Sequence, residues 1–191
     1  MVNIKFIIGS TRPNRFGPKM ADWLMDLARQ RNDAHVELID LAKLNLPMLD
    51  EPQSAVTGQY ENEHTKAWSQ LIAKTDGFVF VTPEYNHGYP ASLKNAIDYL
   101  FAEWNYKPVA MAAYGAEAGG ARSIEQLRQV AGWVRMYDIA HFVTVPNYWT
   151  QLNEQGNFQP TERQIEDANK MLDQLVFWAT HMKAARAQLK A

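Results

Sequence analysis

Short runs of apolar residues recur along the chain, and each run stops at residues that form turns. The runs lie at residues 4–8, 77–81, 109–113 and about 140–145, the first and last of them with one or two polar residues, and a glycine or proline follows within two residues of each run. Apolar runs of this length predict strands that are buried on both faces of a parallel sheet. Residues 35–39 alternate more between apolar and polar side chains, so we expect this strand nearer the sheet edge.

Between these runs, apolar residues recur at the spacing of amphipathic helices. A last helix is expected to begin near Thr161, because Thr161 and Gln164 have the spacing of a capping box. Strands that alternate with helices predict an α/β fold with helices on both faces of a parallel sheet. Five strands favour a flavodoxin-like three-layer sandwich of order 2-1-3-4-5 over a six-stranded dinucleotide-binding fold. The other expected helices span residues 20–29, 65–75, 92–101 and 124–134.

The composition is that of one folded domain, which we expect to cover residues 1–191. Hydrophobic residues make up 47% of the chain, and no repeat, low-complexity tract or linker divides it. The absence of cysteine excludes disulfides, thiolate nucleophiles and cysteine-bound zinc or iron–sulfur sites. The histidines are scattered without the spacing of metal ligands, so we expect no metal site.

The charge and hydropathy of the chain narrow its range of partners. A net charge of −2 gives no basic surface for nucleic acid. No apolar run approaches the roughly 20 residues of a membrane-spanning helix. The N-terminal apolar stretch is also shorter than the core of a secretory signal. We therefore expect a cytoplasmic protein that binds neither nucleic acid nor membranes.

The loop after the first strand has the features of an anion site. Residues 9–17 join a strand to the start of a helix, where free backbone amides and the helix dipole favour phosphate. The hydroxyls of Ser10 and Thr11 can donate hydrogen bonds, and Arg12 and Arg15 can neutralise a dianion. The loop has neither a dinucleotide-binding glycine motif nor a P-loop motif. The alternative is a polar turn with surface arginines.

Two further loops follow predicted strands and suggest a flat ligand. Residues 82–90 contain two prolines and a glycine, so their exposed backbone can recognise the edge of a planar ring. Tyr85 can lie against the face of such a ring, and His87 is a candidate general acid that could equally be a solvated loop residue. Gly115, Gly119 and Gly120 precede a helix and allow a ligand to approach the backbone closely. Together the three loops suggest flavin mononucleotide, FMN.

At these residues, 9–17, 83–98 and 115–122, the chain resembles the NAD(P)H-dependent FMN reductase family, which includes quinone, azo and chromate reductases. The resemblance covers about residues 3–180 and implies bound FMN and a homodimer or homotetramer. Arg15 and Phe16 stand where some family members have serine or asparagine. The implied contacts to the phosphate and ribityl chain are Ser10, Arg12, Arg15, Phe16 and Gly17. Those to the isoalloxazine are Pro83, Glu84, Tyr85 and Asn86, with Gly115 and its neighbours on the pyrimidine side.

The expected activity is hydride transfer from NADPH or NADH, a transient substrate, to flavin N5 and then to an acceptor. The acceptor would be a quinone, an azo compound, free flavin or a metal ion, and one shared site implies ping-pong kinetics. No side chain needs to act as a catalytic residue, because the cofactor carries the chemistry. The alternatives are a flavodoxin-type electron carrier, which the near-neutral charge disfavours, and a flavin-free interaction protein.

Three other segments lead to structural expectations. Residues 92–101 form a helix with an apolar face that either packs in its own core or contacts a second subunit, and the resemblance favours the subunit contact. Lys94 and Asp98 can pair on this helix. The polar residues 50–63 are expected to be exposed, or to form the edge of the pocket or a partner contact. Tyr148 and Trp149 follow a strand and are candidates for the pocket wall.

Overall fold

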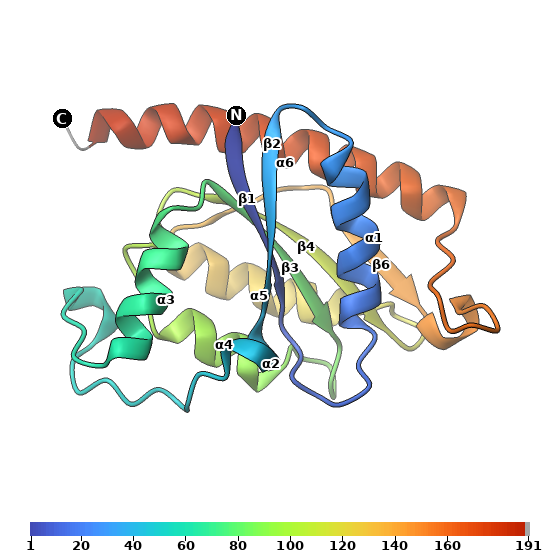
Figure 1. The fold of residues 1–191 in the computed structure, drawn as a ribbon, viewed down its shortest axis with the longest axis horizontal. Coiled ribbons are helices and arrows are strands. Elements are labelled where there is room, and N and C mark those ends of the chain that lie inside the picture. The colour runs from blue at the N-terminus through green and yellow to red at the C-terminus, as the bar shows by residue number, and fades with distance from the viewer. Residues whose placement is uncertain (190–191) are drawn as a thin grey trace.

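The chain folds around a parallel sheet whose strands follow the order β2-β1-β3-β4-β5, with β6 also paired to β4 (Figure 1). The computed structural model describes residues 1–189. This order confirms the predicted flavodoxin-like topology. The strands are β1 Val2–Ile8, β2 Ala34–Asp40, β3 Gly77–Pro83, β4 Pro108–Gly115, β5 Tyr137–Asp138 and β6 Val143–Pro146. The α-helices are α1 Gly17–Arg29, α2 Leu41–Leu44, α3 Glu63–Ala73, α4 Ala91–Asp98, α5 Ala121–Trp133 and α6 Glu162–Leu189.

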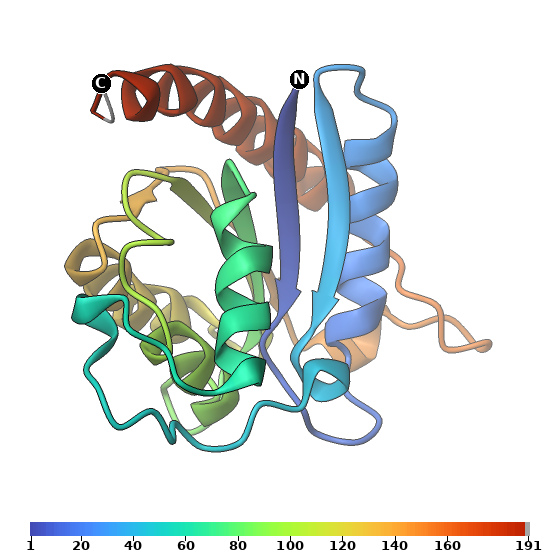
Figure 2. The ribbon, with the colours of Figure 1, turned by 60° about the vertical axis from the view of Figure 1, so that its left-hand side comes forward.

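Helices cover both faces of the sheet, as the sequence predicts. Helices α1 and α6 pack on one face, and α3, α4 and α5 pack on the other (Figure 2). The side chains of β3 alternate between these layers, with Val79 and Val81 toward α1 and α6 and Phe78 and Phe80 toward the other face. Each such fully buried side chain contributes about 1.5–3 kcal/mol by leaving water. This two-sided burial explains why the central strands are continuous apolar runs.

The far edge of the sheet differs from the prediction of one strand over residues 140–145. Two short strands pair with β4 instead, with Tyr137 in register with Pro108 and Val143 with Ala112. Between them the chain leaves the edge toward α6, where the backbone amide of His141 donates to the side chain of Gln174 at 3.1 Å. The segment therefore bends to contact a helix, which its apolar composition did not reveal.

The apolar face of α4 packs inside its own subunit, against our expectation of a subunit contact. Leu93, Ile97 and Leu100 are each 1% exposed. They belong to the core layer that contains the fully buried Trp68 and Trp104. These large indole rings cover the helix from within the chain, so any subunit contact must use other residues. The expected pair of Lys94 and Asp98 is confirmed, at 2.5 Å.

The start of α6 confirms the predicted capping box. The amide of Gln164 donates to Thr161 Oγ1 at 3.2 Å, and the amide of Thr161 donates to Gln164 Oε1 at 2.8 Å. Two donors that helix formation leaves free are thus satisfied. Over the described residues, none of the helices combines the length and the hydropathy that crossing a bilayer requires.

Candidate functional site

The loops after β1, β3 and β4 meet at one edge of the sheet, where they line a pocket of about 330 Å³. Two of these loops lie side by side beyond the ends of β1 and β3 (Figure 1). Strands β2 and β3 lie on opposite sides of β1, so the strand order reverses direction at β1. This edge is therefore the topological switch point at which such folds bind ligands. The lining residues are Arg12, Pro13, Asn14, Arg15, Phe16, Pro83, Glu84, Tyr85, Tyr114, Gly115, Ala116, Tyr148 and Trp149.

Ser10 joins the first loop to the second. Its side chain is fully buried, and its hydroxyl lies 2.8 Å from the hydroxyl of Tyr85. The same oxygen accepts from the backbone amide of Arg12 at 3.3 Å. Ser10 thus holds the first loop in place from its buried side, and Tyr85 points its hydroxyl toward that loop. Thr11 instead lines a neighbouring pocket of about 400 Å³, together with Ser92 and Asn95.

Arg15 lies between the pocket and a buried carboxylate. Its Nη2 donates to Asp40 Oδ2 at 2.5 Å, and the two side chains are 15% and 9% exposed. Asp40 also accepts from the amide of Ala42 at 3.0 Å, which caps α2. The charge of Arg15 is therefore already balanced by Asp40, a partner that we did not predict. Its Nε atom is buried without a hydrogen-bond partner.

Tyr114 is a pocket residue that sequence reasoning missed, although it directly precedes the glycine of the third loop. It is 3% exposed, and its hydroxyl donates to no acceptor among the described residues, whereas the backbone amide of Gly17 faces the hydroxyl oxygen. Burial raises the pKa of this phenol above its usual range, so the hydroxyl stays protonated. Gly17 lies against it, and a Cβ at Gly17 would come within 3.2 Å of the hydroxyl oxygen. The site therefore offers a buried hydroxyl, that of Tyr114, which is free to donate a hydrogen bond.

Aromatic rings form one wall of the pocket. Phe16 stacks on Tyr148 with ring centroids 4.7 Å apart, and it meets Tyr114 edge-on at 5.0 Å. Trp149 adjoins Tyr148 at 5.3 Å and is 53% exposed at the mouth. The expectation that Tyr148 and Trp149 form a pocket wall is thus confirmed. Phe16 packs in this wall and also lines the pocket, and its contact to the phosphate or ribityl chain stays a prediction.

The second loop is a tight hairpin turn. Tyr85 and Gly88 exchange backbone hydrogen bonds of 2.8 and 3.0 Å, and Asn86 and His87 have φ values of 50° and 68°. Two central residues with positive φ are typical of a type I′ turn. Ser123 Oγ of α5 lies 2.9 and 2.8 Å from the carbonyl oxygens of Pro83 and Gly88, which share its single donor, and this contact ties the loop to the helix. His87 lies exposed at the tip of the turn and does not line the pocket.

The three glycines of the third loop have different roles. Gly120 has φ of 93°, and a Cβ there would lie 2.5 Å from the Cβ of Ala113, so only glycine fits. Gly119 also has positive φ and packs against Pro146. Gly115 alone of the three lines the pocket. Gly119 and Gly120 therefore fold the loop onto the sheet, and Gly115 leaves its backbone open to a ligand.

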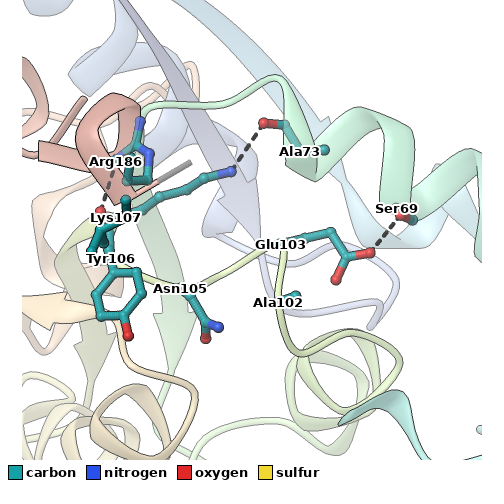
Figure 3. Close-up of a pocket in the computed structure, with 9 residues that line it drawn as sticks. Ser69, Ala73, Ala102, Glu103, Asn105, Tyr106, Lys107 and Arg186 are labelled. Atoms are coloured by element: carbon teal, nitrogen blue, oxygen red, sulfur yellow. Dashed lines mark hydrogen bonds between the residues drawn. The ribbon is translucent and has the colours of Figure 1, made fainter. Parts of the chain in front are cut away.

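A larger cavity of about 430 Å³ lies at the amino ends of β3 and β4 (Figure 3). Its charged side chains hold the surrounding elements together. Glu103 accepts from Ser69 of α3 at 2.6 Å, and Lys107 donates to the carbonyl of Ala73 at 3.2 Å. Arg186 of α6 donates to a backbone carbonyl of the loop before β4 at 2.8 Å. Because these groups serve the fold, the smaller pocket at the carboxyl ends is the candidate functional site.

The fold and the pocket define a flavodoxin-like α/β protein whose switch-point pocket is lined by Arg12 and Arg15 of the first loop. Residues 2–150 match the family of NADPH-dependent FMN reductases, and the chain belongs to this family. An NAD(P)H-dependent FMN reductase of Schizosaccharomyces pombe is 46% identical over 135 residues, which cover 70% of this chain and 67% of the relative. An NADPH:quinone oxidoreductase of Arabidopsis thaliana is 30% identical over 173 residues, covering 88% and 82%.

A solved structure shows the same fold over almost the whole chain. FerB of Paracoccus denitrificans, a flavoenzyme NAD(P)H:(acceptor) oxidoreductase, superposes with a TM-score of 0.76 at 20% identity. The match covers 95% of this chain and 99% of FerB. At this identity the similarity supports the architecture alone.

Proposed function

We propose that this enzyme binds FMN and uses it to pass electrons from NADPH or NADH to a small acceptor, with quinones as the favoured class. The observation that carries this proposal is the convergence of three strand-end loops on one pocket in a chain of the FMN reductase family. The quinone oxidoreductase of Arabidopsis supports the acceptor class.

The unpaired polar atoms of the pocket fit the phosphate and ribityl chain of FMN. Buried polar groups in proteins are almost always hydrogen-bonded, yet Arg15 Nε and the Tyr114 hydroxyl donate to no acceptor in residues 1–189. Both residues line the same pocket, beside the exposed Arg12. Phosphate and ribityl oxygens are acceptors that would satisfy these donors. We assign Arg12, Arg15 and Tyr114 to this part of the cofactor.

The remaining lining residues suit a flat ring. Pro83, Glu84 and Gly115 bring backbone to the pocket, where it can meet the ring edge, although the amides of Glu84 and Tyr85 already donate to the carbonyls of Tyr114 and Gly88. Bound FMN supplies the hydride acceptor and donor, so the protein contributes position and electrostatics. Tyr148 and the half-exposed Trp149 offer aromatic surface at the mouth, against which a nicotinamide and then a quinone can stack. Use of one mouth by both substrates predicts ping-pong kinetics.

We also propose a cytoplasmic homodimer, which can pair further into a homotetramer. The supporting feature is a surface depression between the loop that precedes α3 and the end of α5. There Leu49, Val56 and Trp133 are 47%, 62% and 76% exposed, which is unusual for a residue as large as tryptophan. Trp133→Glu is expected to yield a monomer in light scattering, and an unchanged oligomer would exclude this surface.

The cofactor assignment is tested by releasing the bound ligand from purified protein and identifying it by chromatography. We expect FMN as the main species, because the first loop holds one phosphate group rather than a pyrophosphate. Titration of the apoprotein with FMN and with FAD then measures the preference directly. Predominant FAD, or a protein that takes up neither flavin, would contradict the proposal.

A further inference from the structure

The carboxylate of Glu84, in the loop after β3, pairs with the guanidinium of Arg122, in the first turn of α5. Glu84 directly follows β3, lines the pocket and has a side chain that is 10% exposed. Arg122 Nη1 donates to its Oε1 at 2.7 Å, and the backbone amide of Arg122 donates to its Oε2 at 3.2 Å. The side chain of Arg122 is 50% exposed. The pair therefore links a residue that lines the pocket to one that is exposed at the surface.

The carboxylate occupies the start of α5. The residue that precedes this helix, Gly120, has no side chain with which to cap it, and Glu84 supplies the missing acceptor from another loop. The side chain of Glu84 packs beside Gly115 of the pocket lining, because a Cβ at Gly115 would come within 3.3 Å of the Cβ of Glu84. The negative charge of Glu84 thus lies beside Gly115, which lines the pocket. The positive charge of Arg122 contacts that carboxylate from outside the pocket lining.

We propose that Glu84 and Arg122 set the redox potential of bound FMN as two opposed charges, an inference that rests on the proposed function. Reduction makes the flavin ring more electron-rich, so a nearby cation favours the reduced form and a nearby anion favours the oxidised form. Paired, the two charges nearly cancel at the ring. Removal of the Glu84 charge leaves the cation unbalanced and raises the potential. Removal of the Arg122 charge leaves the anion unbalanced and lowers it.

The test compares the midpoint potentials of FMN bound to Glu84→Gln, Arg122→Gln and the double variant. Glu84→Gln is expected to raise the potential, and Arg122→Gln to lower it. Because Arg122 is half-exposed, solvent limits the change in reduced-to-oxidised affinity ratio to about three- to tenfold, or about 15–30 mV for a two-electron couple. The double variant should lie close to the wild type. Arg128→Gln is the control, because Arg128 lies on the same helix, pairs with Glu125 and does not line the pocket.

The conservative variant Arg122→Lys separates charge from shape. It keeps the cation, so the wild-type potential should be retained even if the geometry of the pair changes. Equal shifts of the same sign in Glu84→Gln and Arg122→Gln, or no shift in FMN-loaded protein, would overturn the inference. Loss of FMN from Arg122→Gln that Arg122→Lys fails to restore would also overturn it, since the role would then be structural. Wild-type protein that binds no FMN would instead contradict the proposed function.

Discussion

Replacement of Tyr114 by phenylalanine should stabilise the apoprotein and weaken FMN binding at the same time. The Tyr114 hydroxyl is buried and donates to no acceptor among the described residues, whereas we assign it an acceptor in the bound cofactor. An unsatisfied buried polar group costs about 1–3 kcal/mol. Tyr114→Phe removes that cost, and we expect the free energy of unfolding of the apoprotein to rise by about 1 kcal/mol. For a domain of this size, the corresponding rise in Tm is about 2–4 °C.

The same substitution removes a hydrogen bond from the FMN complex, which contributes about 0.5–1.5 kcal/mol. The gain of the apoprotein and the loss of the complex add in the binding cycle to about 1.5–2.5 kcal/mol. FMN affinity should therefore fall roughly 10- to 70-fold. Thermal unfolding of the apoprotein and fluorescence titration with FMN measure the two effects separately.

Tyr85→Phe is the matched control, because the Tyr85 hydroxyl already lies 2.8 Å from Ser10 Oγ. Its loss should destabilise the apoprotein by about 0.5–1.5 kcal/mol, the opposite sign to Tyr114→Phe. A Tyr114→Phe apoprotein with a lower Tm than the wild type would refute the reasoning about the buried hydroxyl. An unchanged FMN affinity would refute the assignment of Tyr114 to the cofactor.

Three other substitutions test separate parts of the account. Arg12→Ala should weaken FMN about 10- to 150-fold in calorimetric titration, since it removes a charge-assisted contact of about 1.5–3 kcal/mol; unchanged affinity would exclude a phosphate contact. Gly120→Ala should lower the Tm and reduce FMN content, because its Cβ would lie 2.5 Å from that of Ala113; a wild-type Tm would contradict this packing. Burial raises the pKa of Asp138, despite the opposing charge of Arg128, so its ionisation costs stability as pH rises through the folded pKa. Asp138→Asn should therefore raise the Tm at pH 7, with the gain lost near pH 3; a gain independent of pH would contradict the assignment.

The fold was predictable because its central strands are buried on both faces. Such burial favours apolar runs, which are continuous at β3 and β4 and are interrupted at β1 by Lys5, a buried residue that pairs with Glu37. The split of the last edge into β5 and β6 was not predictable, since it depends on a contact between His141 and Gln174 of α6. The inward packing of α4 likewise depends on tertiary contacts, with Trp68 of α3 and with Trp104, which follows α4 and folds back onto it.

The candidate site was predictable as a set of loops and less so as a set of contacts. Glycine in each loop, together with proline or arginine, identifies the three loops, and parallel strands bring their carboxyl ends to one edge. The partners of individual side chains depend on three-dimensional proximity. The pairing of Arg15 with Asp40, and of Glu84 with Arg122, joins segments with no common local pattern. Tyr114 was missed because a tyrosine at the end of an apolar strand resembles ordinary core.

The central claim is that this chain alone transfers electrons from a nicotinamide to a small acceptor through bound FMN. The direct measurement is an anaerobic titration of purified FMN-loaded protein with NADPH, and in parallel with NADH, followed by absorbance near the flavin maximum. We predict that one of the two bleaches the flavin stoichiometrically with no partner protein present, and that a benzoquinone then restores the absorbance. A flavin that stays oxidised in excess NADPH and NADH, but is reduced by dithionite, would contradict the account and favour an electron carrier.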